Sequence, residues 1–262
     1  MKLLGRAVSP GHATGSALVS GKPLSFLGGV SLDTGVISDP GSDVLGESVV
    51  GRVLAFPHGK GSTVGSYVLY GLVKRGIGPV GIVNAHAEGV VAAGAILAGV
   101  PLVDSIDVSV LMKGDIVTVD GDRGSIALPR VSETRVATAF VRNRGRILVL
   151  RRARTAPTFP GLWSGVSGVI ERNERPIRRA RTEVREETGI RNIRFRATGP
   201  IVYVRHEHSV IAVSPILFDA PSRRVELNWE NEEVRWVTPS DLARLETVPR
   251  LREAFDAVSR AR

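Results

Sequence analysis

The segment from Gly168 to Ile190, GVIERNERPIRRARTEVREETGI, constrains the fold of this chain more than any other stretch. Pro176 suits the first position of a helix, because its fixed φ is helical and its missing N–H is not needed there. Gly189 suits the left-handed residue that follows the end of a helix. We therefore predict a helix that begins at Pro176 and ends just before Gly189.

Three glutamates of this predicted helix share one face. Glu183, Glu186 and Glu187 are spaced i, i+3 and i+4, which makes their carboxylates neighbours. Neighbouring like charges destabilise a helix unless a cation lies among them, and Mg²⁺ prefers such oxygen ligands. A solvated acidic face is the usual meaning of a charge run. Here arginines flank the cluster while its inner face stays acidic, which favours a divalent-metal site.

The segment resembles the Nudix box, written G-x5-E-x7-R-E-U-x-E-E-x-G-U with U aliphatic. The positions in register are Gly168, Glu174, Glu183, Val184, Glu186, Glu187, Gly189 and Ile190. One position departs, because Thr182 stands where the family has an arginine that pairs with the box glutamates. Arg181 or Arg185 could replace that arginine only in part, so the departure bears on the catalytic rate more than on the fold.

This resemblance implies a Nudix hydrolase domain, an α/β/α sandwich that cleaves a nucleoside diphosphate-type linkage with Mg²⁺ or Mn²⁺. The implied metal ligands are the main-chain carbonyl of Gly168 and the carboxylates of Glu183, Glu186 and Glu187, with Glu174 in support. The three helical glutamates are also the implied catalytic residues.

Composition changes near residue 130, which predicts two domains within the 262 residues. Glycine is concentrated before this point, whereas all three tryptophans follow it. We expect a first domain over residues 1–128, a linker over 129–134 and a second domain over 135–262.

The net charge of +9 falls entirely in the second half. Such asymmetry is compatible with nucleic-acid binding, and equally with a site that attracts small phosphate and diphosphate compounds. No basic stripe is interleaved with aromatic residues, so we favour small-molecule substrates over a nucleic-acid partner.

The chain contains no cysteine, which excludes disulfides and any iron–sulfur or zinc–thiolate site built from its own thiolates. The uncharged run 89–103 is too short to cross a bilayer. The first residues lack the long apolar region of a signal peptide. We expect a cytoplasmic protein with no membrane partner.

Short apolar runs alternate with glycine-rich turns in the first half, which is typical of a layered α/β domain. The expected strands are 49–56 and 80–84, the expected helices are 67–74 and 86–98, and the expected terminal hairpin joins 115–120 to 125–128.

The loop from Gly59 to Ser66, GKGSTVGS, is the candidate site of this half. Its glycines let the backbone approach a ligand closely. Free amides at the start of the following helix attract anions, and Lys60 adds a positive charge. The glycine spacing fits neither a Walker A loop nor G-x-G-x-x-G. Taken alone, a glycine-rich turn is more often structural than catalytic.

Several segments of the first half resemble the small subunits of archaeal phosphomevalonate dehydratase, which are swivel domains of the aconitase X group. They are residues 25–37, 51–72, 94–104 and 114–126. The resemblance implies an aconitase-type swivel β/α fold with Ser62 as the proton acceptor. We expect Lys60, Gly61 and Thr63 to bind the substrate.

The same resemblance implies a separate, cysteine-containing large subunit that carries the 4Fe–4S cluster, in agreement with the absence of cysteine here. The family reaction is the loss of water from (R)-5-phosphomevalonate, which gives trans-anhydromevalonate 5-phosphate in the modified mevalonate route to isoprenoids.

The second half is expected to contain further strands that suit a Nudix domain. They are 135–141 paired with 146–152, two strands within 201–218 that meet around 205–209, and a late strand at 230–237. Trp163 and Trp236 fit core positions better than base-stacking platforms.

Other candidate ligands lie outside the box. Glu230 and Glu233 could add a further acidic group, with surface salt bridges as an equal alternative. His206 and His208 form an H-x-H that could bind metal, although the tip of a polar hairpin is the better interpretation.

These observations predict a fusion of a dehydratase small subunit with a Nudix hydrolase domain. Two alternatives stay open. The first half could be a binding module without enzymatic role, which the intact GKGST loop argues against. The second half could be a sensor that binds a nucleotide without cleaving it, an alternative that Thr182 supports. A Nudix-type isopentenyl diphosphate isomerase is nearly excluded, because that chemistry uses a cysteine.

Overall fold

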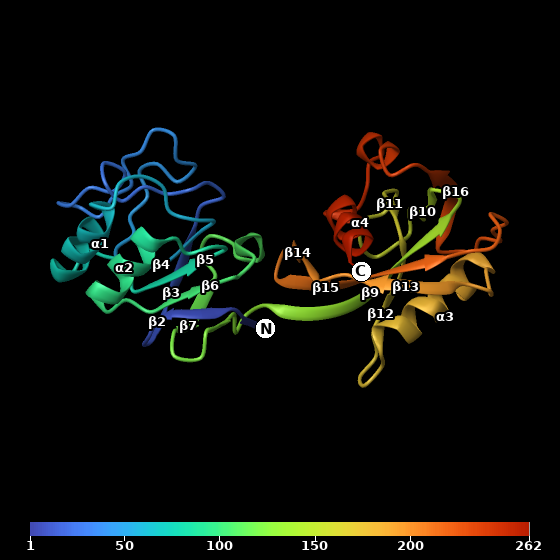
Figure 1. Cartoon of the computed structure of the whole chain (residues 1–262), viewed down its shortest axis with the longest axis horizontal. Coiled ribbons are helices and arrows are strands. Elements are labelled where there is room, and N and C mark those ends of the chain that lie inside the picture. Colours follow the sequence, from blue (N-terminus) through green and yellow to red (C-terminus); the bar gives the residue numbers. More distant parts are fainter. Residues whose placement is uncertain (262) are drawn as a thin grey trace. The chain divides into compact units, whose positions relative to one another are not determined.

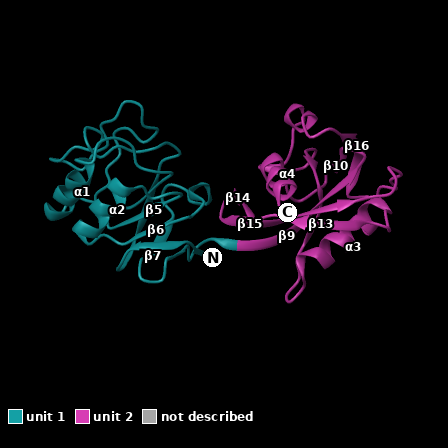
Figure 2. Cartoon of the chain, viewed as in Figure 1, with its two compact units in different colours: residues 1–132 teal, residues 133–262 magenta. Residues whose placement is uncertain are grey.

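The computed structural model describes residues 1–261 and divides into two compact units, 1–132 and 133–262 (Figure 2). The division falls inside strand β9 (Ser132–Asn143). Residues 132–134 are therefore strand, within the segment 129–134 that the sequence predicts as a linker. The β-branched residues that favour a strand begin before Arg135, which explains the early start. Within the described residues, no helix is both long and apolar enough to span a membrane.

The first unit is built on an eight-stranded mixed sheet with the order β1-β8-β7-β3-β4-β5-β6-β2 (Figure 1). The strands are β1 (Lys2–Leu4), β2 (Arg6–Ser9), β3 (His12–Val19), β4 (Val53–Phe56), β5 (Gly81–Asn84), β6 (Leu102–Asp104), β7 (Ile116–Asp120) and β8 (Ser125–Ala127). Strands β3 to β6 are parallel, and the remaining pairs are antiparallel.

Two helices, α1 (Gly65–Lys74) and α2 (Gly89–Ala98), follow β4 and β5 and pack against each other. Their apolar residues share one core cluster with β4 and β5. A short 3₁₀ turn, η1 (Val108–Val110), precedes the terminal hairpin. This arrangement confirms the layered α/β prediction for the first half.

Two predicted boundaries in this unit were early. Strand β4 begins at Val53 and not at residue 49. Helix α2 begins after Glu88, whose carboxylate accepts hydrogen bonds from the main-chain N–H groups of Val90 and Val91. Because this cap starts the helix, His86 lies in the preceding loop.

The second unit contains an eight-stranded sheet whose main path is β11-β10-β9-β15-β13, with β12 paired to β9, β14 to β15 and β16 to β10. Besides β9, its strands are β10 (Arg146–Arg152), β11 (Trp163–Ser164), β12 (Val166–Val169), β13 (Arg194–Thr198), β14 (Val202–His206), β15 (Ser209–Asp219) and β16 (Asn231–Val237). Both predicted hairpins, β9–β10 and β14–β15, are present.

Helices α3 (Pro176–Thr188) and α4 (Leu251–Arg260) belong to two different cores of this sheet, and η2 (Asp241–Arg244) packs with α4. Strand β9 shows the alternation that separates the cores. Ala139 and Val141 belong to the core of α3, and Phe140 belongs to the core of α4. The second unit is thus the predicted α/β/α sandwich.

Candidate functional site

Helix α3 positions the three glutamates that the sequence singled out. It begins at Pro176 and ends at Thr188, and Gly189 follows in a left-handed conformation with φ of 70°, as predicted. Ala180 and Val184 are buried in the core, and α3 packs against β12. This packing fixes the rotation of the helix about its own axis.

Glu187 is almost fully buried, with 5% of its surface exposed. Its Oε1 accepts a hydrogen bond from the main-chain N of Ser167 at 3.2 Å, and its Oε2 accepts one from Nδ2 of Asn231 at 2.7 Å. Burial raises the pKa of Glu187 to about 8, although the hydrogen bond from Asn231 acts to lower it. A carboxylate in this environment strongly favours a bound proton or cation over a bare charge.

Glu183 lies against the main chain of Gly168. A Cβ at position 168 would come within 1.9 Å of Oε1 of Glu183, so only glycine leaves room for the carboxylate. Arg179, one turn earlier in α3, forms an ion pair with it. Burial raises the pKa of Glu183, and the charge of Arg179 opposes this shift. The carboxylates of Glu186 and Glu230 also raise it.

Two other box residues are more exposed. Glu186 is exposed on α3. Glu174 accepts a hydrogen bond from the main-chain N of Glu171 at 3.1 Å. Glu174 therefore supports the turn that leads into the helix.

The sequence left two roles open for Glu230 and Glu233, a further acidic group at the site or a surface salt bridge. The structure gives the two residues different roles. Glu230 raises the pKa of both buried glutamates, so it belongs to their electrostatic environment. Glu233 forms ion pairs with Arg235 at 2.6 Å and with Arg151 at 3.7 Å, which is the surface role.

Neither neighbouring arginine replaces the one that is missing at Thr182. Arg181 donates a hydrogen bond to the carbonyl of Ile193 at 3.0 Å, and its guanidinium lies 5.4 Å from the centre of the Phe218 ring. Arg185 is exposed. The side chains on both sides of Thr182 in the helix are thus directed elsewhere.

Sequence reasoning missed two partners of the buried glutamates. Arg179 stands four residues before Glu183, and this helical spacing is a local signal that could have identified it. Asn231 comes from β16, and 44 residues separate it from Glu187. No local spacing connects these two positions.

The cluster has the chemistry of a site for a hard divalent cation. Two buried carboxylates with raised pKa values lie beside the main chain of β12, and Mg²⁺ and Mn²⁺ prefer carboxylate and carbonyl oxygens. The three helical glutamates do not gather their oxygens within 4.8 Å of one another. Glu183 faces Arg179, Glu187 faces Asn231, and Glu186 is exposed.

An open cleft of about 650 Å³ adjoins the cluster. Ser167 and Gly168 line the cleft, and the same residues contact Glu187 and Glu183. The other lining residues are Val136, Thr138, Arg152, Thr158, Phe159, Ser164, Val169, Val204, Ile211, Val213, Val248 and Pro249. Arg152 also lines a second cavity, which Glu187 and the exposed Trp229 share.

The histidines and the remaining tryptophans have structural surroundings. His206 packs edge-on to Phe159, with 5.2 Å between ring centres, and His208 is exposed in the β14–β15 turn. Trp163 is buried in the core of α4, as predicted, and the half-buried Trp236 packs against the core of α3.

In the first unit, the GKGST loop joins β4 to α1. Gly61 has a φ of 103°, and a Cβ on Gly59 would come within 2.3 Å of Oε1 of Glu88. Glycine is therefore required at both positions. Ser62 is exposed just before α1, and its Oγ accepts a hydrogen bond from the main-chain N of Val64 at 3.3 Å.

Lys60 makes an ion pair with Asp39, at 2.8 Å between Nζ and Oδ2. The hydrogen bond from Lys60 lowers the pKa of Asp39. Lys60 and Gly61 line one shallow pocket with Asp39, whereas Ser62 and Thr63 do not line it. The structure thus brings together only part of the predicted substrate-binding set.

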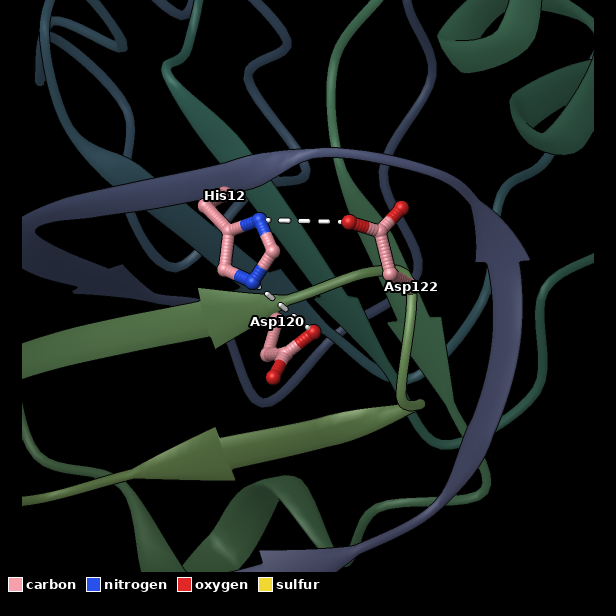
Figure 3. Close-up of side chains that lie close together, drawn as sticks. All are labelled: His12, Asp120 and Asp122. Atoms are coloured by element: carbon pink, nitrogen blue, oxygen red, sulfur yellow. Dashed lines mark ion pairs between the residues drawn. The ribbon is translucent and has the colours of Figure 1, made fainter.

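A group that was not predicted consists of His12, Asp120 and Asp122 (Figure 3). Nε2 of His12 lies 3.1 Å from Asp120, and Nδ1 lies 3.2 Å from Asp122. The main-chain N of Gly11 donates to Asp122 at 2.9 Å. These contacts join the turn before β3 to the turn after β7.

Comparisons with known proteins match each of the two units to a family. The profile of the aconitase X swivel domain matches residues 2–128. The phosphomevalonate dehydratase small subunit of Pyrococcus furiosus is 57% identical over 128 residues, which are 49% of this chain and 96% of that protein. The chain belongs to the aconitase X swivel-domain family. Within this family, a solved structure of Thermococcus kodakaraensis aconitase X is 50% identical and covers 49% of this chain and 98% of its own, with a TM-score of 0.48.

This swivel-domain protein also carries a NUDIX domain, whose profile matches residues 132–258. The MutT protein from Methanosarcina mazei is 28% identical, and the match covers 48% of this chain and 92% of that structure, with a TM-score of 0.42. The match to the small subunit of Pyrococcus furiosus and the NUDIX match thus cover different halves of this chain.

Proposed function

We propose that the NUDIX domain hydrolyses a diphosphate linkage with a divalent cation held by Glu183, Glu186, Glu187 and the carbonyl of Gly168. The observation that carries this proposal is the pair of buried glutamates with raised pKa values, directly beside an open cleft. When bound, Mg²⁺ or Mn²⁺ supplies charge neutralisation of the diphosphate and activation of water.

The residues of the chain prepare this site. Ser167 and Asn231 fix the two oxygens of Glu187, and Arg179 fixes the carboxylate of Glu183. Both carboxylates are thereby held in place before substrate arrives, which is the usual role of such supporting contacts. Glu230 adds negative charge to the same environment and is a further candidate ligand.

The test is release of orthophosphate or a monophosphate from a panel of organic diphosphates, with Mg²⁺ and with EDTA. We expect activity that requires the metal and falls at least a hundredfold in Glu187→Gln. Glu233→Gln is the matched control, because Glu233 is engaged in surface ion pairs. Activity that survives EDTA or Glu187→Gln would contradict the proposal.

A nucleotide sensor is the second candidate for this domain, since Thr182 replaces the box arginine. A sensor would bind a nucleotide with Mg²⁺ and release no product. Nucleotide binding without cleavage by both the wild type and Thr182→Arg would favour this alternative over the hydrolase.

We propose that the swivel domain is the small subunit of a phosphomevalonate dehydratase. Its support is the 57% identity over nearly the whole length of a protein that bears this name. The proposed reaction removes water from 5-phosphomevalonate, a step toward isoprenoids. The proposed partner is a cysteine-containing large subunit, whose 4Fe–4S cluster would supply a Lewis acid at the leaving hydroxyl.

Ser62 would accept the proton in this reaction, since it is exposed in the loop before α1. A serine needs a lowered pKa to act as a base. The main-chain amides before α1 are the nearest source of positive potential, because Lys60 is paired with Asp39. Lys60, Gly61 and Thr63 remain the proposed substrate-binding residues.

The chain should therefore lack dehydratase activity by itself and gain it with a phosphomevalonate dehydratase large subunit. Ser62→Ala should abolish turnover while the two subunits still co-purify. Full turnover by Ser62→Ala would contradict the role of Ser62. Failure of the wild-type chain to bind any large subunit would contradict the proposed partnership and leave the swivel domain as a binding module.

A further inference from the structure

The cleft of the NUDIX domain adjoins the glutamate cluster through two residues, Ser167 and Gly168. Ser167 lines the cleft and donates its main-chain N–H to Glu187, at 3.2 Å. Gly168 lines the cleft and contacts the carboxylate of Glu183. A molecule whose diphosphate reaches these glutamates therefore has the cleft available for the rest of its structure.

The walls of this cleft are mainly apolar. Aliphatic side chains come from β9, β12, β14, β15 and the segment before α4, and they are Val136, Val169, Val204, Ile211, Val213, Val248 and Pro249. Phe159 adds an aromatic ring. Among the described residues that line the cleft there is no Asp, Glu, Asn or Gln, the side chains that read adenine or cytosine. Arginine can read guanine, but Arg152 is bonded to Thr158.

Most of the polar groups in the lining are already engaged with one another. The hydroxyls of Thr138 and Ser167 share a hydrogen bond of 2.9 Å. Arg152 donates to the carbonyl of Thr158 at 2.9 Å and to its hydroxyl at 3.4 Å. These contacts use part of the hydrogen-bonding capacity that the lining offers to a polar ligand, whereas an apolar ligand group leaves them intact.

Arg152 is the one charged side chain among the described residues that line the cleft. Arg152, the charged residue of the lining, also lines the cavity that contains Glu187 and Glu230. An anionic group is therefore favoured beside Arg152 and the metal ligands. The remaining walls favour a hydrocarbon, because burial of apolar surface is the main contribution that such walls can make to binding.

We propose that the substrate of the NUDIX domain is a diphosphate ester of an apolar alcohol. This inference rests on the proposed hydrolase function. It assigns alkyl or alkenyl diphosphates as the substrate class, in place of the nucleoside diphosphates that the Nudix resemblance implies. Water attacks the terminal phosphorus, the bridging P–O bond breaks, and the products are the alkyl monophosphate, orthophosphate and a proton.

Diphosphates of increasing chain length test this directly: methyl, butyl and octyl diphosphate, with ADP as the nucleotide probe and Mg²⁺ held constant. We expect kcat/KM to rise by up to about fourfold per methylene, since burial of one CH₂ contributes about 0.8 kcal/mol. Octyl diphosphate should exceed ADP. Equal values for methyl and octyl diphosphate, or a higher value for ADP, overturn the substrate class.

A matched pair of variants tests the role of the walls. Ile211→Asn places a polar amide in the cleft, and Ile201→Asn makes the same change at an exposed position outside it. Ile211→Asn should lower kcat/KM for octyl diphosphate at least tenfold and change the value for methyl diphosphate less than about twofold. Ile201→Asn should change neither. An equal loss for both substrates in Ile211→Asn contradicts the proposal.

Binding of octyl methylenebisphosphonate, which resists hydrolysis, separates this inference from the hydrolase function. Binding of this analogue at least tenfold tighter than its methyl homologue, without cleavage of octyl diphosphate, keeps the ligand class and refutes hydrolysis. Cleavage of ADP without chain-length preference keeps hydrolysis and refutes the ligand class. Neither binding nor cleavage of any alkyl compound refutes both.

Discussion

Arg179 forms an ion pair with Glu183, four residues later on the same face of α3. Arg179 lies one turn before Thr182, which stands at the box position of the missing arginine. The Nε of Arg179 is buried and has no hydrogen-bond partner of its own. The helix thus keeps a guanidinium on Glu183, supplied from a different position.

Loss of Arg179 should therefore disturb the site, and an arginine at 182 should compensate. Arg179→Ala should lower hydrolysis at least tenfold and destabilise the protein by about 2 kcal/mol, as expected for a charged hydrogen bond to a buried group. Adding Thr182→Arg to this variant should recover most of the rate. Kinetics and urea unfolding of the single and double variants measure both effects.

A double variant as inactive as Arg179→Ala would show that the two positions are not equivalent. Arg178→Ala is the matched control, because Arg178 is exposed on the same helix, and it should change neither rate nor stability appreciably.

The hydrogen bond from Asn231 to Glu187, at 2.7 Å, should matter for metal binding. Supporting contacts of this kind commonly change metal affinity or activity by about 10–100-fold. We expect Asn231→Ala to raise the Mg²⁺ concentration for half-maximal activity within this range. Asn192→Ala, at an exposed position, is the control. An unchanged Mg²⁺ dependence in Asn231→Ala would remove Asn231 from the site.

Glu187 should make the metal-free protein less stable as the pH rises. Its pKa is raised from 4.5 to about 8 by burial, so between these values the folded chain holds a proton that the unfolded chain has released. The free energy of unfolding therefore falls from about pH 5 to pH 8. Urea unfolding in EDTA at several pH values should show this fall, and Glu187→Gln should reduce it. Parallel curves for both proteins would contradict the assignment.

The two units should fold independently, because each has its own sheet and core. Fragments that end or begin near residue 132 should each unfold cooperatively in calorimetry. The cut must leave β9 with the second unit, since this strand pairs with β10 and β12. A fragment that is unfolded alone would show that the units depend on each other.

Local signals in the sequence predicted the parts of the structure that local physics determines. Pro176 and Gly189 bound α3 as expected. The spacing predicted one shared face for three glutamates, of which Glu183 and Glu187 are buried and Glu186 is exposed. The start of α2 was missed because Glu88 caps the helix through its side chain. The contact from Asn231 depends on strand packing across 44 residues, which no local pattern encodes.

The apolar cleft was also outside the reach of the sequence. Val136, Ile211 and Val248 come together only after the strands and the segment before α4 have packed. Each of them is an aliphatic residue of a type that is common in strands and loops, so none of them marks a binding site in the sequence. Their shared role is visible only in the folded domain.

Binding of Mn²⁺, followed by electron paramagnetic resonance of the free ion, tests the central claim most directly. The account predicts that the full-length protein binds Mn²⁺ more tightly when methylenebisphosphonate is present. Under the same conditions, Glu187→Gln should bind Mn²⁺ at least tenfold more weakly than the wild type. Equal Mn²⁺ affinity in the wild type and in Glu187→Gln would contradict the glutamate cluster as the metal site of the NUDIX domain.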